Sequence, residues 1–88
     1  MPIISMFYGI IIRLFLIDNK HHNLPHIHAK YGEFGEEIDI RTLQVFKGEL
    51  PKRAKTLVLE WADEHRAELE HDWELARQKQ ELKDIEPL

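Results

Sequence analysis

The sequence predicts one α+β domain, an antiparallel sheet of about four strands with one long C-terminal helix or helix pair packed on one face. Up to residue 50, β-branched, aromatic and Leu residues form short runs bounded by turn residues, which is typical of strands. After residue 50 the apolar residues recur every three or four positions, which is typical of an amphipathic helix. No repeat, linker or low-complexity tract divides the 88 residues, so we expect residues 1–88 to form a single domain.

The first predicted strand covers residues 7–17. These residues are aromatic, β-branched or Leu, apart from Gly9 and Arg13. Because side chains alternate between the two faces of a strand, the apolar even positions are expected to face the core. The odd positions are also mostly apolar, which implies that a tail or a second subunit covers the other face.

The next two strands are expected to form a hairpin after a loop at residues 18–25. They cover residues 26–31 and 36–41 and flank a turn at residues 32–35. A further short strand is expected at residues 43–47. Together with the first strand, these segments make up the predicted antiparallel sheet.

The helical half begins at Pro51, which suits the first helical position because a missing N–H costs nothing there. One apolar stripe follows at helical spacing: Ala54, Leu57, Val58, Trp61, Ala62, His65, Leu69, Trp73 and Ala76. The two tryptophans on it are interpreted as core residues. The pattern leaves open whether the helix is one rod or breaks near residues 70–72. Pro87 prevents helix at the end of the chain, where Ile85 and Leu88 are expected to dock on the core.

Charge is distributed unevenly along the chain, whose net charge is -4. Residues 1–56 carry eight Lys+Arg and six Asp+Glu, whereas residues 57–88 carry four and ten. One interpretation is a sheet half followed by a solvated acidic helix. The other is that the basic half meets an anion and the acidic half repels it, which would orient a polyanionic partner.

The composition excludes several classes of protein. With no cysteine, a disulfide framework, a Cys-based zinc site and a thiol nucleophile are excluded. The longest apolar run is far shorter than the ~20 residues that span a bilayer. The first five residues lack the charged start and small-residue cleavage site of a secretory signal. We therefore expect a soluble cytoplasmic protein with no membrane partner.

Histidines concentrate where the predicted hairpin begins, with four between residues 21 and 28. Alternate residues of a strand share a face, so His26 and His28 are expected to project together. The predicted four-residue turn places His28 opposite Asp39 and His26 opposite Arg41. The same register pairs apolar residues with each other on the other face, which supports it.

This polar face predicts two kinds of chemistry, and the sequence does not choose between them. As a catalytic site, His26 and His28 would serve as acid and base, with Asp39 orienting an imidazole. Arg13 or Arg41 would hold a phosphate. As a metal site, His26, His28 and Asp39 would bind zinc or another divalent ion and leave coordination open for water. Solvent-facing histidines beside carboxylates are the plainer alternative.

A second candidate site is the group of cations at the start of the helix, Lys52, Arg53 and Lys55 with Lys47 nearby. Cations at this end oppose the helix dipole, which favours anions there. A phosphate bound by these side chains and the free N–H groups would offset the cost. A nearby acidic surface, such as Glu49 or a partner's carboxylates, would do equally well.

Motifs along the whole chain carry a family resemblance. They are residues 1–5, residues 7–10 with Arg13, Pro25-His26-Ile27-His28, Tyr31-Gly32, Ile38-Asp39-Ile40, Gly48 with Leu50-Pro51, the helix residues Trp61, His65, Leu69 and Trp73, and residues 85–88. With them the chain resembles the bacterial family described as domain of unknown function 4160. It departs from that family at Leu24, where a second proline is common, at Ile27, where an aromatic is common, and in a longer loop around His21 and His22.

The resemblance implies a small single-domain bacterial protein that is often encoded beside another small protein. That arrangement invites comparison with toxin–antitoxin pairs. Together with the second apolar face of the first strand, it makes an interaction module our leading expectation, acting as a homodimer or with a small protein partner. The alternative is a His/Asp-dependent phosphodiesterase or ribonuclease-like enzyme, with or without a metal at His26 and His28. The sequence identifies no cofactor, and the negative net charge argues against tight nonspecific binding of long DNA.

Overall fold

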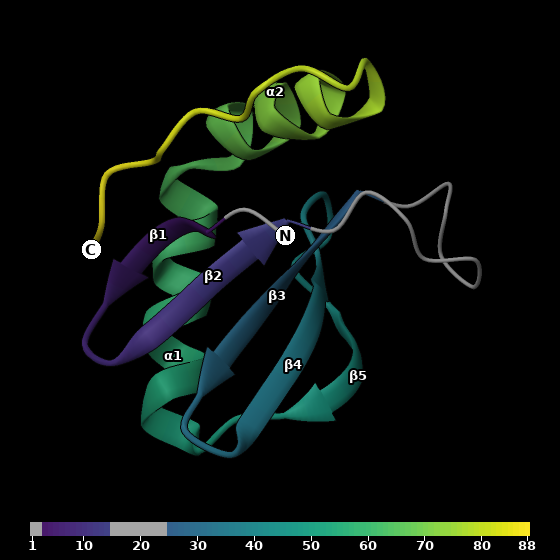
Figure 1. Cartoon of the computed structure of the whole chain (residues 1–88). Helices are drawn as coiled ribbons and strands as arrows, with labels where there is room; N and C mark the ends of the chain where they lie inside the picture. The colour runs from purple at the N-terminus through teal and green to yellow at the C-terminus, as the bar shows by residue number, and fades with distance from the viewer. Residues whose placement is uncertain (1–2, 15–24) are drawn as a thin grey trace.

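The computed structural model describes residues 3–14 and 25–88 and confirms the α+β class. Five strands form one antiparallel sheet, in which neighbours along the chain are neighbours in the sheet. The strands are β1 (Ile3–Phe7), β2 (Ile10–Leu14), β3 (His26–Tyr31), β4 (Phe34–Asp39) and β5 (Val45–Glu49). The helices are α1 (Lys52–Glu64) and α2 (Arg66–Arg77). Figure 1 shows α1 lying behind the sheet and α2 lying across one end of it.

A hairpin replaces the long first strand predicted over residues 7–17. The chain turns at Tyr8 and Gly9, whose φ angles are 50 and 79°, and β2 then pairs antiparallel with β1. Glycine adopts such left-handed backbone at no steric cost, which is why the turn falls there. Residues 15–17 lie outside the described part of the chain. The sheet therefore has five strands rather than about four.

The core lies between the sheet and α1. It consists of side chains from one face of the strands and from the apolar stripe of the helices, namely Ile4, Phe7, Ile10, Ile12, Leu14, Ile27, Ala29, Ile38, Ile40, Ala54, Val58, Trp61, Ala62, Leu69 and Trp73, with Leu50, Ala76 and Ile85. The ring of Trp61 is 5.3 Å from that of Phe7, measured between centroids. Both tryptophans are buried, which confirms their interpretation as core residues.

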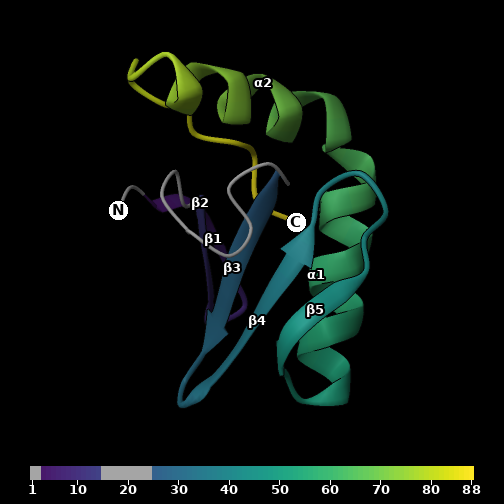
Figure 2. The ribbon, with the colours of Figure 1, turned by 90° about the vertical axis from the view of Figure 1, so that its right-hand side faces the viewer.

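The helical half is a pair of helices that separate at His65. The backbone there has φ -115° and ψ 25°, outside the helical region. The helix therefore does not break near residues 70–72, the position that the sequence left open. The hydrogen-bond ladder resumes at once, since the N–H of Leu69 donates to the carbonyl of His65. Figure 2 shows that α2 then crosses the end of the sheet where β3 begins. Neither described helix is long and apolar enough to cross a membrane.

The C-terminal segment runs back along α2 and ends near β1, as Figure 1 shows. The N–H of Ile85 donates to the carbonyl of Ile4, and the indole Nε1 of Trp61 donates to the carbonyl of Glu86, both at 2.8 Å. Ile85 is buried and Leu88 packs against the core, so the predicted docking of this segment is confirmed. The segment also occupies part of the free edge of β1, where unpaired backbone groups would favour association with another chain.

Candidate functional site

The candidate site lies on the face of the sheet that points away from α1, which we call the outer face. Four adjacent strands each contribute one side chain to it, and these pair in register: Arg13 with His28, His28 with Glu37, and Glu37 with Lys47. Their neighbours in sequence, such as Ile12, Ile27 and Ile38, point into the core. We call Arg13, His28, Glu37 and Lys47 the cross-strand row.

The register of the β3–β4 hairpin decides which acid joins the histidines. The turn has two residues, with Gly32 at φ 57°, instead of the four predicted, so Tyr31 pairs with Phe34. His28 therefore lies opposite Glu37 and His26 opposite Asp39, and the predicted pairing of His28 with Asp39 is wrong by two residues. A shift of two residues leaves every side chain on its original face, so the polar and apolar faces are as predicted.

Three potential ligands converge at the start of β3. The Nε2 atom of His28 lies 3.3 Å from Oε1 of Glu37, and Nε2 of His26 lies 4.0 Å from the same oxygen. One ligand atom from each of the three residues lies within 4.8 Å of the other two. His26 is fully buried, Glu37 is buried and His28 is half-buried. We call His26, His28 and Glu37 the His–Glu cluster.

One of these separations, 3.3 Å between His28 and Glu37, fits the coordination sphere of a zinc ion as it stands, and the others are longer. A neutral or charge-assisted N–H···O hydrogen bond is usually 2.7–3.2 Å long, shorter than both distances from the Glu37 oxygen. Ligand atoms placed tetrahedrally on a zinc ion at 2.0–2.2 Å are separated by about 3.3 to 3.6 Å. Small side-chain adjustments would therefore bring all three ligands onto one divalent ion.

The second oxygen of Glu37 has a separate partner. Its Oε2 atom lies 3.7 Å from Nζ of Lys47, the next residue of the cross-strand row. The ring of His26 also packs against the ring of Trp73 from α2, with 5.7 Å between centroids. Such contacts fix the orientation of candidate ligands before any ion arrives.

A pocket of about 550 Å³ opens beside the cluster on the outer face. Its lining combines the cross-strand row with the hairpin: Arg13, His28, Ala29, Lys30, Glu33, Phe34, Gly35, Glu36, Glu37, Lys47 and Gly48. His28 and Glu37 thus belong to both the cluster and the pocket wall. If an ion were bound by the cluster, its coordination positions without a protein ligand would face this pocket.

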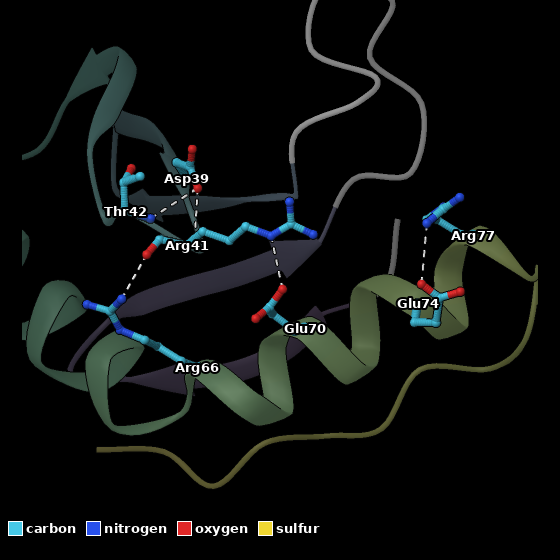
Figure 3. A network of polar contacts seen from close by, with 7 residues as sticks. All are labelled: Asp39, Arg41, Thr42, Arg66, Glu70, Glu74 and Arg77. Carbon is cyan, nitrogen blue, oxygen red and sulfur yellow. Dashed lines mark hydrogen bonds and ion pairs between the residues drawn. The ribbon is translucent and has the colours of Figure 1, made fainter.

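Asp39 was predicted as a metal ligand or as an acid that orients an imidazole, but in the structure its side chain stabilises a turn. Its Oδ1 accepts hydrogen bonds from the backbone N–H groups of Arg41 and Thr42, at 2.7 and 3.2 Å. Figure 3 shows these bonds closing the turn after β4. An Asp side chain commonly stabilises turns in this way. Glu37 therefore takes the place that the sequence gave to Asp39.

Arg41 is also absent from the site. It lies in the turn after β4, and its Nε donates to Oε1 of Glu70 on α2 at 3.0 Å. Its carbonyl accepts a hydrogen bond from Nη1 of Arg66 at 2.7 Å (Figure 3). Arg41 thus ties the sheet to α2, whereas Arg13 is the predicted arginine that does line the pocket.

The cations at the start of α1 separate into two groups. Lys55 forms an ion pair with the buried Glu36, with Nζ 3.2 Å from Oε2, and the same oxygen accepts the N–H of Leu50 at 2.9 Å. Lys52 and Arg53 are exposed. An acid thus pairs with one of the three cations, Lys55, and this acid is Glu36 rather than the Glu49 named from the sequence.

Sequence reasoning did not name Glu36 or Glu37 as candidate site residues. A signal for them existed, since two adjacent acids in a strand must point to opposite faces. One of the two then has to enter the core side of the sheet, where a charge needs a partner. The remaining histidines of the early cluster, His21 and His22, lie outside the described residues.

Comparison with known protein families gives one match. The family model described as Domain of unknown function (DUF4160) matches residues 9–74, a range that contains the cross-strand row and the His–Glu cluster. Searches of curated proteins and of solved structures gave no significant match. The range matched is about three quarters of the chain, and the chain therefore belongs to the DUF4160 family.

Proposed function

We propose that the chain is a metal-dependent hydrolytic domain in which His26, His28 and Glu37 hold a divalent ion. One observation carries this proposal: three ligand atoms from neighbouring strands converge within 4.8 Å of each other at the wall of a pocket. Two imidazoles and a carboxylate form a donor set that zinc hydrolases use, and non-haem iron(II) enzymes use the same set.

The ion would have both support and free coordination positions. Three protein ligands leave at least one position on a tetrahedral ion for water. A divalent ion held this way lowers the pKa of a coordinated water to near 7, which makes hydrolysis feasible at neutral pH. Lys47 holds Oε2 of Glu37 and leaves Oε1 directed at the two histidines. We also propose the cytoplasm as the location, in keeping with the cysteine-free sequence.

The test is metal content and affinity of the untagged protein. After removal of metals, titration with Zn²⁺ followed by elemental analysis is expected to give one bound ion per chain. Co²⁺ provides a spectroscopic probe, because its visible absorption reports coordination by nitrogen and oxygen donors. Glu37→Gln and His28→Asn are each expected to weaken binding by more than about 100-fold, since even the loss of an outer partner costs 10- to 100-fold.

Matched controls separate this site from casual binding. Glu33→Gln removes an acid that lines the same pocket but lies outside the cluster, and His71→Asn removes an exposed histidine of α2. A variant lacking His21 and His22 removes the other histidines of the same stretch. All three are expected to keep the ion. A stoichiometry near zero, or binding that survives both Glu37→Gln and His28→Asn, would contradict the proposal.

A second candidate function is the interaction module expected from the sequence. Ile3 and Met6 of β1, at 40% and 59% exposure, lie on the outer face beside Ile11 of β2. These apolar side chains support association with a second copy of the chain or with a small protein partner, as in toxin–antitoxin pairs. A homodimer would also supply the cover that the second face of the first strands was expected to need.

Light scattering after size-exclusion chromatography tests this second function. A dimer that Met6→Glu converts to a monomer would support it, and Met6→Leu serves as the matched apolar control. A monomer at all concentrations that recovers no partner from its own cytoplasm would remove the support. Neither result bears on metal binding, because Met6 lies outside the His–Glu cluster.

A further inference from the structure

We infer that a second site, at the end of the molecule away from α2, binds an acidic segment of another protein by taking up one leucine-like side chain. The site is a small pocket between the hairpin turns and the first turn of α1. It lies apart from the His–Glu cluster and from Ile3 and Met6, so neither proposed function has to hold for it. Its size, its exposed aromatic wall and its charge support the inference.

The pocket lies where α1 ceases to cover the sheet. Ile27 and Ala29 of β3 are buried in the core, whereas Tyr31, on the same face of the same strand, is 40% exposed. Figures 1 and 2 show the hairpin turns and the first turn of α1 at the end of the molecule away from α2. The residues that line the pocket are Tyr8, Ile10, Tyr31, Pro51, Arg53, Ala54 and Leu57.

The size of the pocket limits what can occupy it. Its volume is about 150 Å³. Sites for cofactors and other small molecules commonly measure about 300 to 1,000 Å³, so this pocket is too small for such a ligand. Its floor is aliphatic, since Ile10 and Ala54 are buried and Leu57 is half-buried. A single branched aliphatic side chain suits these dimensions, and interfaces gain much of their affinity from anchors of this kind.

Two tyrosine rings form an exposed wall of the pocket. Tyr8 is 68% exposed in the turn between β1 and β2, and Tyr31 lies beside it. A Cβ added at Gly9 would lie 3.3 Å from Cε1 of Tyr31, so this ring packs on the backbone of the turn. Tyrosine is enriched at protein interfaces because it offers a large contact area at a low cost in conformational entropy. The wall is therefore formed before a partner arrives.

Arg53 gives the pocket its charge. It is the one charged residue of the lining, and neither it nor its neighbour Lys52 forms an ion pair with another described residue. The acids nearest in sequence point elsewhere or lie at a distance. Glu33 lines the pocket of the outer face, Glu49 is an outer-face position of β5, and Glu60 is about 10 Å further along α1. The mouth of the pocket therefore favours an acidic partner.

A second copy of the chain does not offer such a segment. Its acids concentrate in residues 57–88, which carry ten Asp+Glu. The large apolar side chains exposed in the described residues all lie before residue 57, namely Ile3, Met6, Tyr8, Tyr31 and Phe34. Single-stranded nucleic acid fits less well, because its backbone follows a groove lined by several cations. We therefore assign the pocket to a different protein.

The test is isothermal titration calorimetry of the full chain with the blocked peptide Glu-Asp-Glu-Leu-Asp-Glu-Asp. Replacing its leucine by alanine is expected to weaken binding by at least about tenfold, the effect of burying one leucine side chain. Replacing its acids by their amides, or adding salt, is also expected to weaken binding. Backbone-amide NMR shifts are expected at Tyr8, Tyr31 and Arg53. Absence of binding, binding that does not depend on the leucine, or shifts centred on the outer-face pocket would overturn the inference.

Variants with matched controls test the site itself. Arg53→Glu is expected to weaken peptide binding by at least about tenfold, since repulsion replaces attraction. Its fold is expected to be retained, because an acid suits the first turn of a helix. Tyr8→Ala is expected to cost at least about fivefold, as the loss of an interface anchor does.

Two controls change residues that do not line this pocket. Lys30→Glu reverses a cation of the outer-face pocket, and Phe34→Ala removes another exposed aromatic ring. Both are expected to bind the peptide as the wild type does. Equal affinity in all four variants would contradict the site. Tighter binding of single-stranded oligothymidylate than of the peptide, or a dimer that Arg53→Glu dissociates, would contradict the acidic protein partner.

Discussion

Two adjacent glutamates of β4 are both buried, yet they point to opposite faces of the sheet and have different partners. Glu36 is 2% exposed and points toward α1, where its Oε2 meets the N–H of Leu50 at 2.9 Å and Nζ of Lys55 at 3.2 Å. Glu37 is 7% exposed and points to the outer face, where His28, His26 and Lys47 lie 3.3, 4.0 and 3.7 Å from its oxygens.

The difference lies in the partners rather than in burial. The two contacts of Glu36 Oε2 are about as short as hydrogen bonds to a charged group should be, so this oxygen has its partners within the chain, whereas the buried Oε1 accepts no hydrogen bond from the described residues. The contacts of Glu37 are longer and converge from three directions, which is the geometry of a group that a bound ion would complete. Burial therefore does not distinguish the two acids, whereas the distances to their partners do.

The largest expected effect comes from removing Glu36, the acid with the short contacts. Glu36→Ala leaves the buried N–H of Leu50 without its acceptor and Lys55 without its ion pair. We expect the free energy of unfolding to fall by about 3 kcal/mol, the cost of a charged hydrogen bond together with an unsatisfied buried donor. Urea denaturation measures it.

Glu36→Gln is the matched control, since its amide oxygen still accepts from Leu50. We expect it to lose less stability than Glu36→Ala. If Glu36→Ala were as stable as the wild type, the two glutamates would not differ in the way that their distances indicate.

The next effect concerns Glu37, the acid that we propose as a ligand of an ion. Zn²⁺ at 100 times its dissociation constant is expected to raise the unfolding free energy of the wild type by about 2.7 kcal/mol. Glu37→Gln is expected to show no such gain, whereas Glu36→Gln is expected to keep it. Thermal denaturation with and without Zn²⁺ measures both. An equal gain in the two variants would show that Glu37 is not a ligand.

Periodicity in the sequence predicted the faces of the elements well. The alternation of Ile27 with His26 and His28 assigned the polar face correctly, and the helical stripe placed Trp61 and Trp73 in the core. These predictions succeeded because burial of apolar side chains imposes the period directly.

Two breaks in the chain direction could not be predicted in the same way. The turn at Tyr8 and Gly9 interrupts a run that stays apolar on both sides, so composition gave one strand where there are two. The break at His65 has neither glycine nor proline to mark it. Both are decided by packing against parts of the chain distant in sequence.

The two histidines of the candidate site were named from the sequence, whereas its acid was not. Gly32 and Gly35 each suit a turn, so the sequence allowed a loop of two or four residues. Registers two residues apart put the same residues on each face, and periodicity cannot separate them. Only the pairing of Tyr31 with Phe34 selects Glu37 over Asp39 as the neighbour of His28.

A third buried carboxylate, that of Asp72, has one oxygen with a short hydrogen bond and one oxygen without any from the described residues. Oδ1 of Asp72 on α2 accepts the N–H of Lys83 at 2.9 Å, and its buried Oδ2 accepts no hydrogen bond from the described residues. Burial raises the pKa of the Asp72 carboxyl above its usual 3.8, and the charges of Asp84 and Glu68 add to the rise. The Lys83 N–H and His71 act in the opposite direction.

We expect Asp72→Asn to be more stable than the wild type at neutral pH, by a Tm difference on the order of a few degrees. The folded carboxyl holds its proton to a higher pH than the unfolded one does. The wild type therefore loses stability as pH rises from 3.8 through the raised pKa. The asparagine variant lacks this loss, while its amide oxygen still accepts from Lys83. Melting curves between about pH 3 and pH 8 are expected to diverge with rising pH, and parallel curves would contradict this.

The smallest effect is expected from an ion pair in water. Arg41 and Glu70 meet at 3.0 Å, as Glu36 and Lys55 do at 3.2 Å, but their side chains are 60% and 50% exposed. A double-mutant cycle with Arg41→Gln and Glu70→Gln is expected to give a coupling of about 0.2 to 1 kcal/mol, reduced by salt. An equal coupling energy for Glu36 with Lys55 would show that the short distance, and not burial, makes the Glu36 ion pair strong. The longer contacts of Glu37 would then remain as the feature that distinguishes it from Glu36.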